Sequence, residues 1–242
     1  MVLAATALAP LGALAPSPAD AVSPYMSSQG QYRYCTNIGL AGCKTWGAVT
    51  KGTLVTMHCW IDDSNATGAY ASPRWFYVTA GSTRGFVHSS RVADQASVPH
   101  CSTHRGISVA RWAAMKEGVL SPTAVEKRGE DAKYWGGWCY LFTADTYIFG
   151  AGATPITGKG SAKKTFEAYK ANGKVSTDLR HNAINVGSMV FWTSGAYGHA
   201  AVYLGQGMVA TTRGATNETK AIEIQPMSLF GTPAGWVAPG NI

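Results

Sequence analysis

The distribution of the five cysteines most limits what this chain can fold into. Four of them, Cys35, Cys43, Cys59 and Cys101, lie in the first half of the chain, and Cys139 stands alone beyond them. A group of four is typical of a disulfide-stabilised unit made in an oxidising compartment. Four cysteines allow three pairings, which the sequence alone does not separate. Cys139 is then the cysteine without an obvious partner.

Cys139 lies in the run Trp-Gly-Gly-Trp-Cys-Tyr-Leu-Phe at 135–142, where two glycines precede an apolar stretch of helical character. A lone cysteine that opens a helix is a candidate nucleophile. Cysteine is also often buried as a small apolar side chain. The position alone favours neither interpretation.

Residues 1–21 have the composition of a signal peptide. An apolar run of Ala, Leu and Val ends in Ala-Asp-Ala at 19–21, a pattern that suits signal peptidase. The basic residues that usually open such a signal are missing, so an interpretation as a truncated signal stays open. Prolines break this run, and no other stretch approaches transmembrane length. We therefore expect a secreted protein, extracellular or cell-wall associated, with no transmembrane segment.

The charge balance indicates an anionic partner. The chain has 20 Lys and Arg against 13 Asp and Glu, a formal net charge of +7. Such a charge favours polyanions, which for an exported protein would be cell-wall polymers or anionic lipid head groups. A role in solubility alone is equally compatible. No recognition motif or basic run indicates nucleic acid, and we expect a monomer.

The first half of the chain predicts a small β-rich unit. Residues 22–44 are polar and are predicted to be a linker with a short disulfide loop, whereas 45–101 contain short strand-like runs with turn residues between them. The runs lie at 54–61, 74–78 and 84–92, and 62–68 is predicted to be a loop. Several short strands in so few residues suggest a small barrel.

The order of motifs in this segment resembles a bacterial SH3 (SH3b) domain. Cys-Trp at 59–60 is followed by Trp-Phe-Tyr-Val at 75–78 and by Gly-Phe-Val-His-Ser-Ser-Arg-Val at 85–92. The resemblance implies a five- or six-stranded barrel over 45–101 that helps to tether an enzyme to peptidoglycan. Cys59 and Cys101 would then bracket the barrel, and their disulfide would contribute about 3–4 kcal/mol. A disulfide between Cys35 and Cys43 would close the preceding loop, although other pairings stay open.

From residue 104 onward the pattern changes to helices followed by strands. Helices are predicted at 108–117, 139–149 and 162–171, the last one capped by Ser161. Strands are predicted at 188–192, 199–204, 208–211 and 221–224. Helices first and strands afterwards indicate an α+β domain over 104–242.

His199 stands where the apolar strand 199–204 begins, a position from which its ring can face a cleft. An imidazole there could act as a general base toward the Cys139 thiol. A neighbouring imidazolium and the first turn of a helix each lower a thiol pKa, so we expect a depressed pKa for Cys139. The amide groups of that turn could also receive an oxyanion. For His199 alone, a structural role would be the ordinary interpretation.

The combination resembles the papain-like NlpC/P60 and CHAP cysteine hydrolases of cell walls. A cysteine that opens a helix is followed by Gly-Ser-Met-Val-Phe-Trp at 187–192 and by Gly-His-Ala-Ala-Val-Tyr-Leu-Gly at 198–205. The resemblance implies a papain-like domain with N-terminal helices and a C-terminal antiparallel sheet. It also implies a peptidoglycan endopeptidase or amidase that needs no cofactor, with Cys139 as the nucleophile and His199 as the base. The third catalytic position falls by spacing at Thr211, with Asn217 and Glu218 as alternatives.

The sequence departs from the NlpC/P60 pattern around the nucleophile. Trp138 and Tyr140 flank Cys139 where Asp-Cys-Ser-Gly is usual, and Gly137 before it is closer to the CHAP pattern. Ser188 stands where Asp is common, and a threonine at the third position supplies no charge. These departures support an alternative, a non-catalytic wall-binding or interaction protein with a degenerate hydrolase domain.

Aromatic residues flank the thiol, and they could line a substrate groove or pack in the core. They are Tyr134, Trp135 and Trp138. The remaining histidines show no paired metal-ligand spacing, so no metal site is expected. They are His58, His88, His100, His104 and His181.

Overall fold

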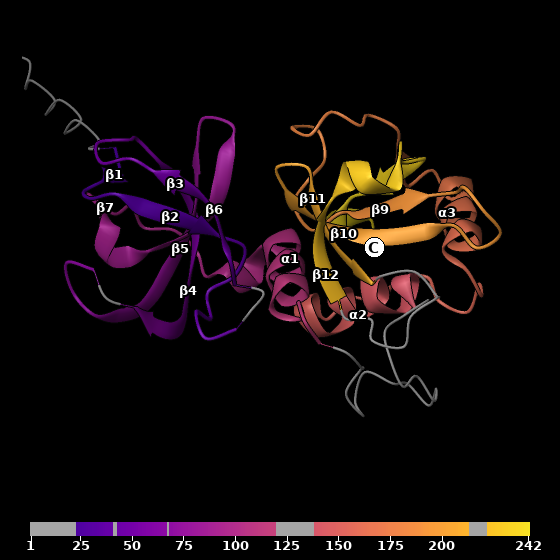
Figure 1. The fold of residues 1–242 in the computed structure, drawn as a ribbon, viewed down its shortest axis with the longest axis horizontal. Helices are drawn as coiled ribbons and strands as arrows, with labels where there is room; N and C mark the ends of the chain where they lie inside the picture. Colours follow the sequence, from indigo (N-terminus) through magenta and orange to yellow (C-terminus); the bar gives the residue numbers. More distant parts are fainter. Residues whose placement is uncertain (1–22, 41–42, 67, 120–137, 213–221) are drawn as a thin grey trace, which may run out of the picture.

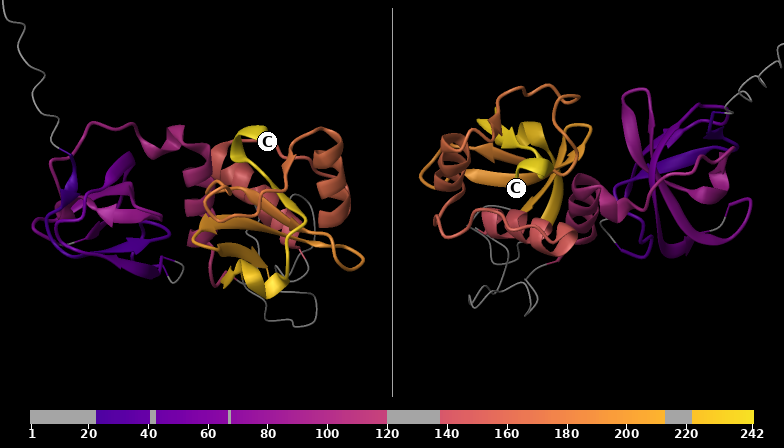
Figure 2. Two further views of the ribbon diagram at one scale, coloured as in Figure 1. Left: turned by 90° about the horizontal axis from the view of Figure 1, so that it is seen from above. Right: turned by 180° about the vertical axis from the view of Figure 1, so that it is seen from behind.

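The computed structural model describes residues 23–40, 43–66, 68–119, 138–212 and 222–242. These residues form two parts that lie side by side, an N-terminal group of strands and a C-terminal sheet with three helices (Figure 1). The two parts are also distinct when the molecule is viewed from above and from behind (Figure 2). The architecture is therefore mixed α and β with several antiparallel sheets.

The N-terminal part is built on one five-stranded antiparallel sheet with the strand order β3-β2-β6-β5-β4, and a short pair, β1 with β7, lies beside it. The bounds are β1 Tyr25–Met26, β2 Gly30–Arg33, β3 Thr45–Val49, β4 Thr56–Ala66, β5 Ser72–Ala80, β6 Thr83–His88 and β7 Val92–Ala93, with the 3-10 helices η1 Ser89–Arg91 and η2 Cys101–Thr103.

Alternation along β5 gives this sheet two apolar faces, as the pleat of a strand requires. Phe76 and Val78 join one buried cluster, whereas Trp75 and Tyr77 join another. The second cluster contains the disulfide between Cys59 and Cys101. A strand that is buried on both faces has little freedom of register, because a slip of one residue would exchange the two faces.

Two sequence-based expectations for this part are corrected. The range 22–44 is not a linker, since β2 lies inside the sheet between β3 and β6, and Tyr32 on it is 1% exposed. The range 62–68 is not a loop along its whole length, since β4 continues to Ala66. The polar side chains that suggested a loop have partners, Arg74 for Asp62 and Arg111 for Asp63. Of these, the pair of Asp62 with Arg74 joins β4 to β5, and a cross-strand pair supports a strand.

The C-terminal part has one six-stranded antiparallel sheet with the order β12-β11-β10-β9-β13-β8. Its elements are α1 Arg105–Met115, α2 Cys139–Ala151, α3 Ala162–Ala171, β8 Val175–Ser176, β9 Met189–Trp192, β10 His199–Gly205, β11 Met208–Thr212, β12 Ile222–Pro226 and β13 Gly235–Val237, with the 3-10 helices η3 Met227–Phe230 and η4 Pro239–Asn241. The predicted helices and strands are confirmed within a few residues, whereas β8 and β13 were not predicted. None of the described helices is long and apolar enough to cross a membrane.

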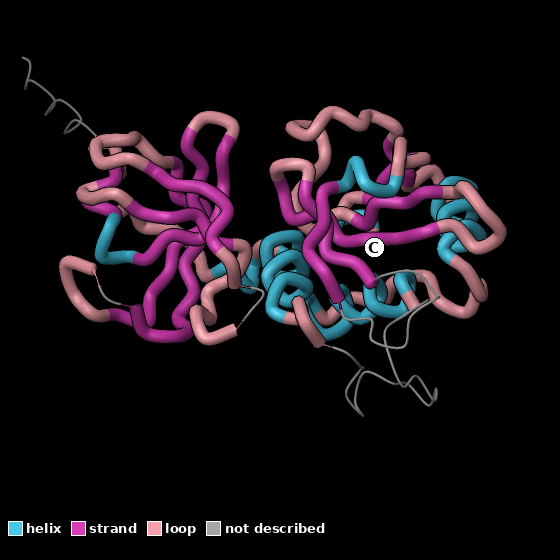
Figure 3. The backbone as a smooth tube through the Cα atoms, viewed as in Figure 1, coloured by secondary structure: helices cyan, strands magenta, loops and turns pink. Residues whose placement is uncertain are grey.

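The helices cover one face of this sheet. Ala200 and Val202 of β10 pack in the cluster that also holds α1, α2 and α3 residues, whereas Ala201 and Tyr203 pack on the opposite face. Helix α1 lies between the N-terminal strands and the C-terminal sheet (Figure 3). It therefore belongs to the core of one part and to the junction with the other.

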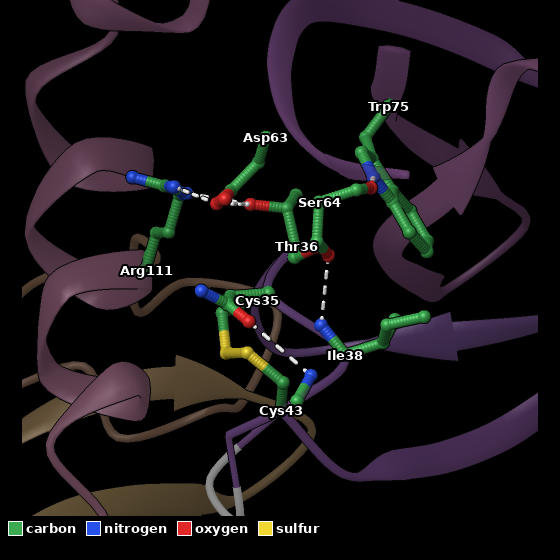
Figure 4. A network of polar contacts seen from close by, with 10 residues as sticks. Cys35, Thr36, Ile38, Cys43, Asp63, Ser64, Trp75 and Arg111 are labelled. Carbon is green, nitrogen blue, oxygen red and sulfur yellow. Dashed lines mark hydrogen bonds and ion pairs between the residues drawn. A yellow bond between two sulfur atoms is a disulfide. The ribbon is translucent and has the colours of Figure 1, made fainter. Parts of the chain in front are cut away.

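The junction between the two parts is partly buried and holds a network of polar contacts (Figure 4). Arg111 of α1 pairs with Asp63 of β4, and its Nε donates to Thr36 Oγ1 over 2.8 Å. Thr36 Oγ1 in turn donates to Asp63 Oδ2 over 2.6 Å. Beside this network, the disulfide between Cys35 and Cys43 packs in the same apolar cluster as the helices. The disulfide loop of the N-terminal part thus completes the core of the C-terminal part.

We expect Arg111→Ala to lower the free energy of unfolding by about 2–3 kcal/mol, because it leaves the Asp63 carboxylate without its counter-ion. The side chains of this pair are only 21% and 17% exposed. Arg74→Ala is the matched control, because Arg74 pairs with the neighbouring Asp62 and both side chains are 43% exposed. The control should cost at most about 1 kcal/mol. Urea denaturation measures both, and equal losses would contradict a special role for the junction pair.

Candidate functional site

The first turn of α2 presents Cys139. The helix begins at this residue, as the sequence predicted, with Trp138 as its N-cap. Its first hydrogen bond runs from the Phe142 amide to the Trp138 carbonyl over 3.0 Å. The N–H groups before this bond lie at the open end of the helix, where they can face a group beside the thiol. Cys139 is the free cysteine of the chain.

Burial raises the pKa of the Cys139 thiol above its ordinary value. Hydrogen bonding from the backbone of Ala200, Tyr140 and Cys139 itself opposes this rise without cancelling it. The expectation of a depressed pKa was therefore wrong, because loss of solvent outweighs the favourable amide groups. The contribution of Ala200 also locates the sulfur, since Ala200 follows His199 at the start of β10. The start of α2 and the start of β10 meet at the thiol.

A cavity of about 540 Å³ opens beside Cys139. Trp138 and Tyr197 belong to its lining and are 38% and 74% exposed, so they form an aromatic rim. Lys159 is the only charged side chain among the described lining residues. Gly198 closes the cavity on the side of β10, and a Cβ there would lie 2.6 Å from the Trp192 carbonyl oxygen. This close approach requires glycine directly before His199.

The hydrogen bonds of Thr211 determine which nitrogen of His199 carries the proton. Thr211 Oγ1 donates to the Ala200 carbonyl over 2.8 Å and lies 2.9 Å from His199 Nε2. A hydroxyl has one proton to donate, so Thr211 must accept from His199 at Nε2. The neutral ring therefore carries its proton on Nε2 and a lone pair on Nδ1. Nδ1 has no hydrogen-bond partner among the described residues.

Aromatic side chains hold the ring of His199. Phe230 of η3 stacks on it at 4.7 Å and 16°, and Trp192 of β9 lies at 5.8 Å. Burial by these neighbours lowers the pKa of His199 to about 4, so the ring is neutral at pH 7. Trp192 lies within the predicted strand motif. Phe230 was missed, because it comes from a distant 3-10 helix and carries no local signal.

The remaining predicted site residues divide into two groups. Trp138 lines the cavity, and Thr211 contacts His199. Four others fall outside the described residues, namely Tyr134, Trp135, Asn217 and Glu218. Among the described residues, no group of three or more His, Cys, Asp or Glu could hold a metal ion.

Comparisons with known proteins find similarity in solved structures. No protein-family model matches the chain, and no curated protein matches it significantly. NlpC2 and NlpC1 from Trichomonas vaginalis are 13% and 12% identical over 89% of this chain, which covers 72% and 68% of them, each with a TM-score of 0.37. An NlpC/P60 family protein from Bacillus cereus ATCC 10987 is 14% identical over 89% of this chain and 63% of its own length, with a TM-score of 0.37.

The depressed pKa of His199 predicts acid sensitivity. Between pH 6.5 and about 4 the unfolded chain binds a proton that the folded chain does not, so the free energy of unfolding should fall as the pH drops. The contribution of His199 to this loss is roughly 3 kcal/mol. Urea denaturation at several pH values should therefore show a shallower pH dependence in His199→Gln. The exposed His181→Gln is the control and should keep the wild-type slope.

Proposed function

We propose that this chain is a secreted cysteine hydrolase that cleaves an amide or peptide bond of peptidoglycan. In this proposal the C-terminal part is the NlpC/P60- or CHAP-like catalytic domain, and the N-terminal part is an SH3b-like unit that binds the wall. Cys139 is the nucleophile, His199 is the general base and Thr211 orients the base. No cofactor takes part.

The observation that carries the proposal is the meeting of two chain segments at one sulfur. A backbone hydrogen bond from Ala200, the residue next to His199, lowers the pKa of the Cys139 thiol, and Cys139 packs against the buried cluster that contains Ala200. Thr211 holds the other side of that imidazole at Nε2 and leaves the Nδ1 lone pair available. A nucleophile, a base and a group that orients the base are the parts that this chemistry needs.

The protonation states suggest how the reaction proceeds. Both resting groups are neutral, since burial disfavours the thiolate and the imidazolium alike. We infer that the thiol proton passes to His199 Nδ1 as sulfur bonds to the substrate carbonyl carbon. The oxyanion lies near the N–H groups of the first turn of α2. His199 then protonates the leaving amine, the C–N bond breaks, and an acyl-enzyme remains.

Water completes the cycle. His199 Nδ1 accepts a proton from a water molecule as its oxygen attacks the acyl carbon. The C–S bond then breaks, the product leaves as a carboxylic acid, and the proton returns to the sulfur of Cys139. The whole sequence consumes one water and needs neither oxidant nor metal.

The cavity suits a peptide that bears an acidic group. Lys159 offers a positive charge on its lining, and Trp138 and Tyr197 offer apolar surface at the rim. Peptidoglycan combines peptide carboxylates with sugar rings, and both kinds of surface can contact it. The motif resemblance at 187–205 and the formal net charge of +7 favour the same substrate.

A second candidate is a wall-binding protein without catalytic activity. Two observations favour it, the raised pKa of the Cys139 thiol and the uncharged Thr211 at the orienting position. Both properties would lower the activity of a hydrolase that depends on a preformed ion pair between thiolate and imidazolium. Under this alternative the cavity would bind wall peptides and release nothing.

We expect wild-type protein to clear a suspension of purified sacculi and Cys139→Ala to lose this activity by at least about 10³-fold, since no other thiol can attack. Turbidity and the release of new amino groups measure cleavage. A pull-down with the same sacculi checks that the variant still binds. Equal clearing by both proteins would refute the hydrolase, and binding without clearing by the wild type would establish the second candidate.

Thr211→Val should lower kcat/KM by about tenfold, because it removes the acceptor for His199 Nε2 while keeping the side-chain shape. Thr212→Val is the matched control, since the neighbouring Thr212 is equally buried and its Oγ1 has no hydrogen-bond partner among the described residues. NMR of the histidine nitrogens should show the Nε2–H form in the wild type and a mixture in Thr211→Val. An unchanged tautomer with lost activity would assign Thr211 a purely structural role.

A further inference from the structure

A basic groove runs along the junction of the two parts. One cavity of about 460 Å³ has His58, Arg84, His104 and Arg105 in its lining. A second cavity of about 600 Å³ shares Thr79 and Arg84 with the first and adds Ser82, His181, Asn182 and Gln206. Because two residues line both, the cavities are neighbours, and we call them together the junction groove. Cys139 lines neither cavity.

The junction groove has no acidic residue among its described lining residues. It nevertheless contains two arginines and three histidines. No Asp or Glu among these lining residues therefore balances the two arginines.

Arg84 lies at the centre of this charge. It comes from β6, just after the turn at Gly81 and Ser82, and lines both cavities. Its guanidinium makes no hydrogen bond or ion pair with the described residues. Arg105 differs, because it donates to the carbonyl oxygens of Pro239 and Ile242. Arg84 is thus the group best able to bind an added anion.

Two histidines, His58 and His104, lie on one side of Arg84. The pKa of His58 is lowered by burial first and then by the nearby His104 and Arg84, so these groups lie close enough to repel one another. His104 Nε2 is buried without a hydrogen-bond partner among the described residues. On the other side, neutral donors follow along the groove from Ser82, Asn182 and Gln206.

We propose that the junction groove binds an anionic polymer that carries phosphate groups, with Arg84 as the principal contact. A guanidinium presents a planar pair of donors that matches two oxygens of a phosphate. The hydroxyl and amide groups farther along the groove suit the remaining oxygens or the hydroxyls of a polyol backbone. Two neighbouring cavities that share Arg84 fit a chain with several anionic groups better than a single ion. This binding is independent of the hydrolysis proposed above.

Fluorescence anisotropy of the full chain with labelled polyphosphate tests the proposal. Arg84→Gln should weaken binding by about tenfold, the effect of losing charge-assisted hydrogen bonds. Lys51→Gln is the matched control, because it removes the same charge from an exposed turn outside the groove and should change binding less than twofold. Equal losses in the two variants would overturn the site and leave only non-specific charge attraction.

Two further comparisons complete the experiment. Labelled poly-L-glutamate of equal charge should bind at least fivefold more weakly than polyphosphate, and equal binding would overturn the assignment to phosphate. If Arg84→Gln does not fold, as judged by circular dichroism, Arg84→Lys and the exposed rim variant His181→Gln replace it. Arg84→Lys should lose at least threefold, since it keeps the charge without the planar donors. Unchanged binding in both replacements would overturn the proposal.

Discussion

The alternation of β10 between two apolar faces is the constraint on which the site depends. Ala200 and Val202 face the helices, whereas Ala201 and Tyr203 face the second layer. This parity directs His199 toward Trp192 and Phe230 and turns the backbone of Ala200 toward the start of α2. A slip of one residue would exchange the faces and move His199 away from Trp192 and Phe230, so packing of the sheet fixes the surroundings of this ring as well as the fold.

Much of the C-terminal part could be predicted because its signals are local. An apolar run with a Ser cap predicts α3, and the spacing of the strands predicts which residue of β11 lies beside His199. The features that the sequence did not predict depend on contacts between residues far apart in the chain. The sequence did not predict β2, because Tyr32 is buried by strands far away in sequence. The predicted end of β4 came too early, because Asp63 pairs with Arg111 on α1. The predicted direction of the Cys139 pKa shift was wrong for the same reason, since burial is a property of the assembled fold.

The junction changes how the N-terminal part can be understood. A tethering unit on a free linker would contribute nothing to the core of its neighbour. Here the disulfide between Cys35 and Cys43 packs with α1 and α2, and Arg111 reaches across to Asp63 and Thr36. The contact fixes the orientation of one part on the other, and a groove between them keeps a defined shape. Removal of the N-terminal part would expose apolar surface of the remaining core.

The raised pKa of the thiol at the start of α2 bears on which cysteines of this chain form disulfides. The same polypeptide holds two oxidised cysteine pairs and one reduced cysteine. Peroxides and foreign disulfides attack the thiolate form, so a sulfur that keeps its proton at neutral pH reacts with them slowly. A cysteine that keeps its proton is a poorer partner in disulfide exchange, which favours the two pairs that the structure contains over a pair with Cys139.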